Sequence, residues 1–224
     1  MPDQTAYPQT PRTIPTRSRD RAHYDRESVH AILDGAYLCH LGFVRDGAPV
    51  VLPTLYARVG ERLYVHGSTG SRPLRAAATA PDDSGIDVCL TVTHVDGLVL
   101  ARSAFHHSLN YRSVLVHGRA VDVRDEDERR IALDAIVDQV VPGRSADSRP
   151  ANAKELAATA VIALDLREVS AKVRTGGPND EPEDLALPYW TGVVPVQQRY
   201  GTPEPAEDLA EGIAVPEYVS RLVG

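Results

Sequence analysis

The chain has 224 residues, of which 42% are hydrophobic and 25% are charged, and its formal net charge is −7. This length and composition predict one soluble globular domain with a full core. A nucleic-acid partner is not expected, because binding to phosphates requires a positive face. A membrane partner is not expected either, since no apolar run approaches the ~18 residues of a membrane span.

Two features predict where the protein resides. The N-terminal sequence MPDQTAYPQTPRT lacks the apolar segment of a secretory signal. The two cysteines, Cys39 and Cys89, lie in apolar, strand-like sequence and are predicted to be buried, reduced thiols. The expected localisation is therefore cytoplasmic.

The first predicted elements are an arm and a helix. Residues 1–22 are rich in Pro, Thr and Arg and have no apolar periodicity, which predicts a flexible N-terminal arm. An arm draped over the domain, or one that contacts a partner subunit, is the alternative. A helix is predicted over residues 25–35, with Asp25 as its N-cap, apolar residues along one face and Gly35 as its stop.

Short β-like runs, separated by turn signals such as Asp46-Gly47 and Asp96-Gly97, dominate the middle of the chain. Strands are predicted over residues 36–44, 48–59, 62–67, 86–93, 97–104, 111–123 and 161–173. The first six of these strands, at close intervals with few helices between them, favour an antiparallel meander that closes into a barrel. Helices with capping-box patterns are predicted over residues 125–141 and 152–160. The predicted fold class is mainly β with a few helices.

The junction LYVHGSTGSRPLRAA, residues 63–77, combines the groups of an anion site. A predicted strand ends at Gly67, and Ser71 caps a predicted helix whose unpaired N–H groups carry partial positive charge. Neighbouring hydroxyls add donors, and Arg72 adds a guanidinium that suits a phosphate. The alternative is a capped helix after a tight turn. The glycine spacing is not that of a Walker loop.

A second polar cluster precedes the strand predicted at residues 111–123. Arg112 and Ser113 stand at the head of this strand, after a loop that contains His106 and His107. An arginine beside a hydroxyl again suits a phosphate. Paired histidines in a loop are more often exposed to solvent, and they lack the companions of a metal site, so no metal is predicted. No Gly-x-Ser-x-Gly motif supports nucleophilic hydrolysis.

A series of motifs in chain order resembles the FMN-binding split-barrel family: RDGAPVVLPTLYA, LYVHGSTGSR, DGLVLARSAFHHSLNYRSVLVHGRA, VPGR, KELAATAVIALDLREVSAKVRTG and YWTGVVPV. More narrowly, the chain is similar to the pyridoxamine 5'-phosphate oxidase-like branch that includes the nitroimidazole-resistance proteins. The resemblance covers about residues 23–196. It implies a six-stranded antiparallel split barrel, an intertwined homodimer, and FMN in two clefts at the subunit interface. Residues 197–224 are predicted to form a C-terminal tail with a short helix.

The resemblance also assigns residues to the flavin. The sequence VVLPTL, residues 50–55, matches a strand whose backbone follows the flavin ring, and residues 66–72 match the FMN phosphate loop. A downstream Arg-Gln-Val matches residues 112–114, with serine in place of glutamine. Trp190 resembles an aromatic residue that reaches the flavin from the partner subunit, although it could instead anchor the tail to the barrel. The implied cofactor-binding residues are Val51, Leu52, Pro53, Thr54, His66, Gly67, Ser68, Ser71, Arg72, Arg112, Ser113, Val114 and Trp190.

His66 is the candidate catalytic residue. Period-two alternation places it with Tyr64 on one face of its strand and places Leu63 and Val65 on the other. If the latter two face the barrel interior, His66 faces the flavin and can orient a substrate or supply a proton. The alternative is a histidine that only hydrogen-bonds the following loop.

The resemblance implies an FMN-dependent oxidoreductase that acts on a small planar or electrophilic substrate in the cleft. The alternative is a non-catalytic flavin or haem binding protein that serves as a sensor, store or regulator, because some split-barrel relatives bind haem or a deazaflavin. Vitamin B6 oxidation is not expected, since the chain runs VVPVQQRYGTPEPAEDLAEG where the true oxidases have an Arg-x-Arg-Leu segment.

Overall fold

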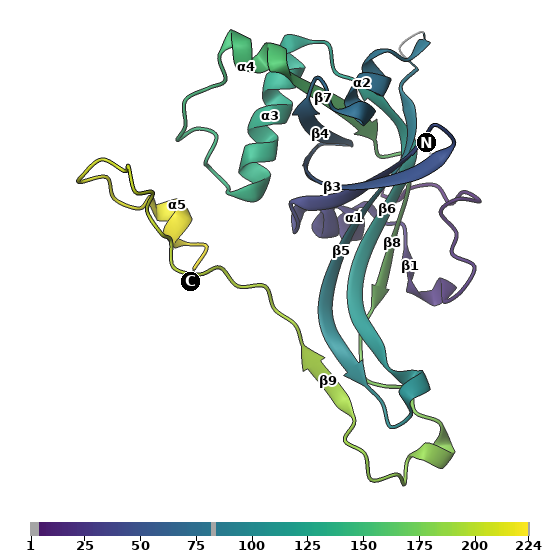
Figure 1. The fold of residues 1–224 in the computed structure, drawn as a ribbon. Helices are drawn as coiled ribbons and strands as arrows, with labels where there is room; N and C mark the ends of the chain where they lie inside the picture. Colours follow the sequence, from purple (N-terminus) through teal and green to yellow (C-terminus); the bar gives the residue numbers. More distant parts are fainter. Residues whose placement is uncertain (1–4, 82–83, 224) are drawn as a thin grey trace.

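The computed structural model describes residues 5–81 and 84–223 and shows an antiparallel β-barrel with helices on its outside (Figure 1). Within these residues, six strands pair around a closed ring in the order β6-β7-β4-β3-β2-β5, and β5 pairs back with β6. The strands are β2 (Leu38–Arg45), β3 (Ala48–Val59), β4 (Arg62–Ser68), β5 (Ile86–Leu100), β6 (Ser108–Asp122) and β7 (Thr159–Asp165). The mainly β, antiparallel fold class predicted from the sequence is confirmed.

Three further strands lie at the edges of this sheet. β8 (Glu168–Arg174) pairs with β6, β1 (Ala22–His23) pairs with β8, and β9 (Gly192–Pro195) pairs with the end of β5. The long strands β5 and β6 continue beyond the barrel as a two-stranded ribbon, and β9 lies along that ribbon (Figure 1). The ribbon carries the C-terminal part of the chain away from the barrel.

Two strand predictions were wrong in detail. The predicted strands 86–93 and 97–104 are one strand, β5, with a bulge between Val95 and Gly97 in place of a turn. A Cβ on Gly97 would lie 3.0 Å from a side-chain carbon of Val193, so the glycine allows β9 to approach closely. The predicted strand 161–173 is the hairpin β7–β8, which reverses at Leu166.

The barrel interior is filled by side chains that alternate along the strands. Leu63 and Val65 of β4 belong to the main core, whereas Tyr64 belongs to a second cluster on the outer face of the barrel. The alternation predicted for β4 is therefore confirmed. The second cluster brings Tyr64 together with Ile136 of a helix, so this outer face is covered by that helix.

Five α-helices are described: α1 (Arg26–Asp34), α2 (Arg72–Ala78), α3 (Glu126–Val140), α4 (Ala153–Ala158) and α5 (Glu217–Ser220). Short 3₁₀ turns occupy η1 (Arg19–Arg21), η3 (Ala104–His106) and η4 (Pro182–Asp184). Asp25 caps α1 with a 2.8 Å bond from the N–H of Ser28, as predicted. Asn152 and Glu155 form the predicted capping box of α4.

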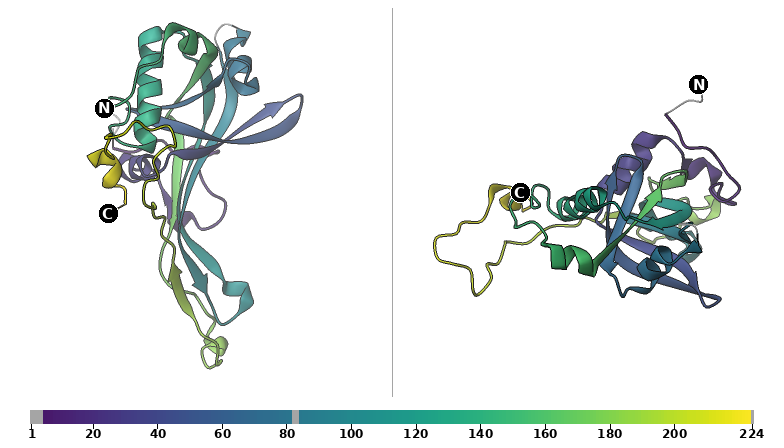
Figure 2. Two further views of the ribbon diagram at one scale, coloured as in Figure 1. Left: turned by 60° about the vertical axis from the view of Figure 1, so that its left-hand side comes forward. Right: turned by 90° about the horizontal axis from the view of Figure 1, so that it is seen from above.

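Helix α3 is attached to β4 through Glu128. Its carboxylate accepts hydrogen bonds from the hydroxyl of Tyr64 (2.8 Å) and the guanidinium of Arg62 (2.7 Å). The predicted capping box is therefore only half formed, because Asp125 accepts from the N–H of Glu128 but the Glu128 side chain reaches the strand. These bonds hold α3 against the outer face of the barrel (Figure 2).

The described part of the N-terminal arm, residues 5–22, is draped over the barrel. Tyr7 is only 3% exposed, and its hydroxyl lies 2.8 Å from both His30 Nε2 and a Glu61 carboxylate oxygen. Thr13 is 2% exposed. The composition of this segment predicts a flexible arm. Two of its side chains are nevertheless buried, because they make contacts with distant parts of the chain.

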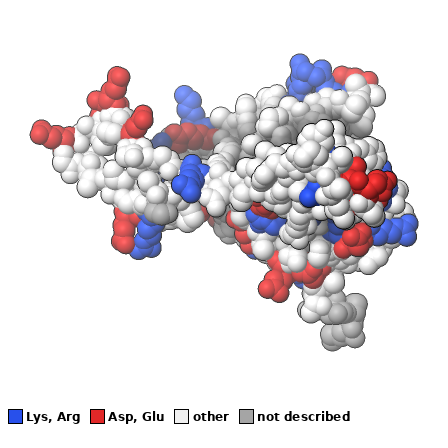
Figure 3. Space-filling view, turned by 90° about the horizontal axis from the view of Figure 1, so that it is seen from below, with Lys and Arg blue, Asp and Glu red and all other residues white. Residues whose placement is uncertain are grey.

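The C-terminal tail runs from β9 to α5, and α5 lies near the segment between α3 and α4 (Figure 1). None of the helices in the described residues is long and apolar enough to cross a lipid bilayer. Acidic and basic side chains are intermingled on the face shown in Figure 3, which has no continuous positive patch.

Candidate cofactor site

A cavity of about 780 Å³ lies between the outer face of β3 and β4, helix α3 and the segment that joins α3 to α4. This volume is within the roughly 300–1,000 Å³ of small-molecule sites. Its walls are mostly apolar on the α3 side and polar on the other. The lining residues are Leu55, His66, Leu133, Asp134, Ile136, Val137, Val140, Val141, Arg144, Ser145, Ala146, Ser148, Arg149, Pro150, Ala151, Glu155 and Thr159.

His66 is the histidine of this cavity. It follows Tyr64 on the outer face of β4 and pairs with Val161 of β7. Its Nδ1 atom is buried and has no hydrogen-bond partner within the part of the chain that the structure describes. Burial lowers the pKa of His66 below its ordinary 6.5, so the ring is neutral at pH 7. A buried ring nitrogen without a partner is costly and calls for an explanation.

Two arginines lie at the polar side of the cavity. Arg149 donates to both carboxylate oxygens of Glu155, at 3.0 and 2.7 Å, and this pairing lowers the pKa of Glu155 to about 2. Arg144 reaches the hydroxyl of Tyr218 on α5 at 3.1 Å. Both guanidinium groups are exposed, so they can also bind an anionic group of a ligand at the cavity mouth.

The backbone of the predicted phosphate loop is largely hydrogen-bonded within the protein before α2 begins. The N–H of Thr69 donates to Ala158 O (3.0 Å), that of Gly70 to the Ser68 hydroxyl (3.2 Å), and that of Ser71 to Ser68 O (2.8 Å). These N–H groups are therefore not free to hold an anion, because the turn itself uses them. Ser71 is the N-cap residue of α2, but its side chain makes no capping hydrogen bond.

The side chains of this loop still face solvent. Ser68 and Arg72 are exposed and Ser71 is half-buried. A Cβ on Gly67 would lie 3.2 Å from a methyl carbon of Leu74, so this glycine lets α2 pack closely on the end of β4. The phosphate assignment to Ser68, Ser71 and Arg72 stays a prediction that rests on their side chains.

The segment of β3 that was expected to follow a flavin ring is open. Val51 is 62% and Leu52 37% exposed, Pro53 is exposed and Thr54 half-buried. The end of the β2–β3 hairpin carries a further exposed apolar residue, Val44, which is 70% exposed. Within one chain nothing described covers this surface, so it is available to a cofactor or a second subunit.

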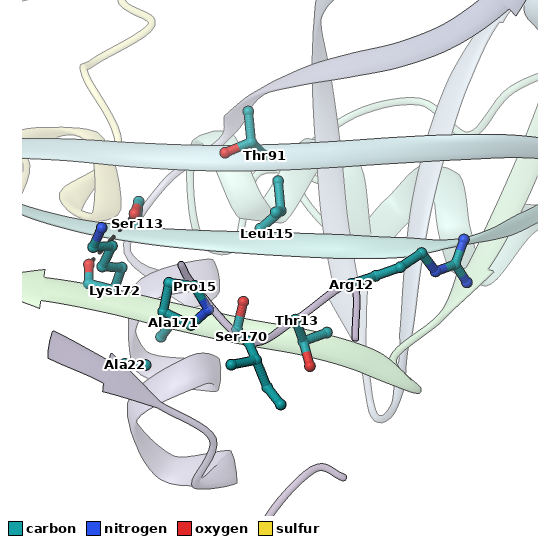
Figure 4. Close-up of a pocket in the computed structure, with 11 residues that line it drawn as sticks. Arg12, Thr13, Pro15, Ala22, Thr91, Ser113, Leu115, Ser170, Ala171 and Lys172 are labelled. Atoms are coloured by element: carbon teal, nitrogen blue, oxygen red, sulfur yellow. Dashed lines mark hydrogen bonds between the residues drawn. The ribbon is translucent and has the colours of Figure 1, made fainter. Parts of the chain in front are cut away.

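Arg112 and Ser113 lie apart from the His66 cavity. Arg112 lines a polar groove of about 750 Å³ together with His40, His94 and the first residues of the tail. The Ser113 hydroxyl lies 3.4 Å from Lys172 O in a smaller groove that the arm covers (Figure 4). Val114 is fully buried in the core and lines neither groove.

Trp190 also lies away from the cavity. It lies two residues before β9, the strand that runs along the ribbon at the far end of the molecule from α3 (Figure 1), and it is 66% exposed. A Cβ on Gly192 would lie 3.0 Å from the indole ring, so the ring folds back over its own chain. A single chain therefore does not bring Trp190 together with His66.

Sequence reasoning missed α3 and the segment 141–151 as walls of the cavity. The sequence feature that could have indicated this wall is the apolar face of α3, on which Val137 is 39% exposed in the folded chain. Among the described residues, no group of three or more His, Cys, Asp or Glu side chains could hold a metal ion.

Comparison with known proteins identifies the family. The family described as Pyridoxamine 5'-phosphate oxidase matches residues 25–173. The flavocytochrome Anf3 from Azotobacter vinelandii is 41% identical, with 96% of this chain and 98% of Anf3 covered and a TM-score of 0.87. An FAD and haem binding protein from Mycobacterium smegmatis is 40% identical, with 91% and 98% covered and a TM-score of 0.84. A search of curated proteins gave no match.

More distant structures share the fold. A candidate 5-nitroimidazole antibiotic resistance protein from Bacteroides thetaiotaomicron is 20% identical, with 68% of this chain and 86% of that chain covered and a TM-score of 0.54. The motifs in the sequence, the closed antiparallel barrel and these matches agree. The chain therefore belongs to the pyridoxamine 5'-phosphate oxidase family of flavin-binding split-barrel proteins.

Proposed function

We propose that the protein is a redox protein that binds both a flavin and haem, with His66 as a ligand of the haem iron. The two relatives that are 41% and 40% identical are described as a flavocytochrome and as an FAD and haem binding protein. The observation that carries the proposal is the neutral His66 in a large, largely apolar cavity, with a buried ring nitrogen that has no partner among the described residues.

The cavity fits haem in three respects. A neutral imidazole nitrogen is a common ligand of haem iron, and His66 offers one without first losing a proton. The apolar wall of α3 suits a porphyrin face, because it excludes water. Arg144 and Arg149 suit the carboxylate side chains of haem, since guanidinium groups bind carboxylates through charge-assisted hydrogen bonds.

The flavin site in this proposal is the open surface of β3 and the loop that follows β4. Val51, Leu52, Pro53 and Thr54 would lie along the ring, and Arg72 would contact a phosphate. Flavin and haem supply the redox chemistry when bound, and the protein orients them and excludes water. His66 is then an iron ligand in place of a proton donor, and an oxidoreductase acting on a small electrophilic substrate remains the proposed activity.

A second copy of the chain would complete the flavin cleft. The surfaces left open in one chain are apolar: Val44 and Val51 on the β2–β3 hairpin, and Trp190 and Val194 near β9, which are 70%, 62%, 66% and 42% exposed. Exposed apolar surfaces of this kind commonly mark subunit interfaces. We therefore propose a homodimer, and light scattering of the cofactor-loaded protein should give twice the chain mass.

The absorbance spectrum of the purified protein tests the proposal directly. After incubation with haemin and with FMN or FAD, followed by gel filtration, the protein should retain a Soret band together with the two flavin bands. Addition of a reduced nicotinamide under anaerobic conditions should then bleach the flavin bands. A protein that retains flavin but no Soret band would show that the His66 cavity does not take haem.

A further inference from the structure

We propose that the C-terminal tail fastens the cavity through Tyr218, and so slows the loss of the molecule bound next to His66. The identity of that molecule as haem rests on the function proposed above. The fastening itself rests on contacts between α5 and the segment 141–152, which we call the cavity loop.

Tyr218 touches the cavity loop at three residues. Its hydroxyl donates a 2.6 Å hydrogen bond to the carboxylate of Asp147 and accepts a 3.1 Å bond from Arg144. Its ring lies over Gly143, where a Cβ would come within 3.9 Å of the ring carbon Cγ. Gly143 has a φ of 89°, a conformation that favours glycine, so the backbone turns tightly beneath the ring.

The cavity loop forms one wall of the cavity. Arg144, Ser145 and Arg149 are among its residues that line the space next to His66. Its first part is bound to α3, because the N–H and hydroxyl of Ser145 donate to Asp138 at 2.8 and 2.7 Å. Its end is fixed by the capping box at the start of α4. Tyr218 contacts the loop from outside, at Gly143 and Arg144 before Ser145 and at Asp147 after it.

The size of the effect follows from the exposure of the groups. Arg144 and Asp147 are 48% and 54% exposed, so their mutual ion pair at 3.6 Å contributes little in water. The two hydrogen bonds of the Tyr218 hydroxyl bridge these charges and are lost together when the hydroxyl is removed. A loss of this kind corresponds to roughly a three- to tenfold faster opening of the loop.

The tail has few other means of staying in place. Between β9 and α5 it has no described helix or strand, and Leu209, Ile213 and Val215 remain 45%, 59% and 50% exposed. All three line a groove of about 350 Å³ together with Arg144 and Asp147 of the cavity loop. Tyr218 is thus the polar contact that links the end of the tail to the cavity loop.

The variant Tyr218→Phe tests the proposal, with Tyr189→Phe as the matched control, because Tyr189 is a 62% exposed tyrosine of the same C-terminal region outside the cavity lining. The first measurement is amide hydrogen exchange in the cofactor-free full-length chain. We expect faster exchange in residues 141–152 of Tyr218→Phe and unchanged exchange in the control. Equal exchange in both variants would overturn the fastening, whatever the cofactor is.

The second measurement is the rate of haem transfer from the reconstituted protein to excess apomyoglobin. We expect Tyr218→Phe to release haem about three- to tenfold faster than the wild type and the control. Faster exchange with an unchanged transfer rate would show that the tail holds the loop but does not retain the cofactor, which overturns the proposal. If the wild type takes up no haem, the proposed function fails, and hydrogen exchange alone decides whether Tyr218 fastens the loop.

Discussion

The guanidinium of Arg112 on β6 donates two hydrogen bonds, both of 2.9 Å, to the carboxylate of Asp96 on β5. The resemblance to the oxidase family assigns this arginine to the flavin site, and its place beside a hydroxyl predicts a contact with the phosphate. Within one chain, however, it already has an anionic partner. The same pairing ties the two strands together next to the bulge at Gly97. An incoming phosphate would therefore have to share or replace Asp96.

Replacement of Arg112 by alanine should destabilise the protein in a pH-dependent way. The hydrogen bonds from Arg112 lower the pKa of Asp96 below its ordinary 3.8. The ionised Asp96 thus contributes stability above that value, and the contribution is lost as the pH falls through the lower folded pKa. Urea unfolding should show that the difference in free energy of unfolding between the wild type and Arg112→Ala becomes smaller below about pH 4. The account would be contradicted if this difference did not depend on pH. It would also be contradicted if Arg112→Ala had the same effect on the free energy of unfolding in a protein that carries Asp96→Asn.

Replacement of Arg72 by alanine should weaken flavin binding. A charge-assisted contact to phosphate contributes roughly 1.5–3 kcal/mol, which is about ten- to a hundredfold in affinity. The matched control is Arg75→Ala, which removes another exposed arginine from the same helix. Fluorescence titrations with FMN and with FAD measure the effect. If the two variants bind flavin with equal affinity, the assignment of Arg72 to the phosphate site is wrong.

Replacement of Tyr7 by alanine should release the N-terminal arm. The buried ring and its bonds to His30 and Glu61 hold the described part of the arm on the barrel. Trypsin should then cut Tyr7→Ala after Arg12 and Arg17 well before it cuts the barrel, whereas the wild type resists. Tyr7→Phe keeps the ring and should be cut at an intermediate rate. Wild-type resistance in Tyr7→Ala would show that other contacts hold the arm.

The buried His66 should make stability depend on pH. Burial lowers its folded pKa below 6.5, so the unfolded chain binds a proton more readily. The cofactor-free protein should lose stability as the pH falls from about 6.5 towards the folded pKa. His66→Gln lacks the titrating group, so its free energy of unfolding should depend less steeply on pH. His30 and His117, whose pKa values are also lowered by burial, contribute equally to both proteins. Denaturant unfolding between about pH 5 and pH 8 measures both slopes.

The strands, most helices and the face of His66 could be predicted because they depend on local patterns. Alternation fixes which side of β4 carries His66, and the capping residues Asp25 and Asn152 mark helix starts. The bulge in β5 could not be distinguished from a turn, since Asp96-Gly97 suits both. The hairpin between β7 and β8 was missed because alternation continues through it.

The cavity could not be predicted because it depends on where α3 packs. That position is set by Glu128, which meets Tyr64 and Arg62 from a distant part of the chain. The position of the N-terminal arm could not be predicted for the same reason. It depends on the burial of Tyr7 against distant parts of the chain, which the composition of the arm does not indicate. The bond from the N–H of Thr69 in the loop after β4 to Ala158 O of α4 likewise joins distant parts of the chain, and no local pattern indicates it.

Haemin titration of the cofactor-free protein, followed by its Soret absorbance, tests the central claim that His66 binds haem iron. His40→Ala is the matched control, because His40 is an exposed histidine of β2 outside the cavity. The wild type and the control should bind haemin stoichiometrically with the same Soret maximum. His66→Ala should bind it more weakly with a shifted maximum, and added imidazole should restore the wild-type spectrum. A His66→Ala protein with the affinity and spectrum of the wild type would contradict the claim.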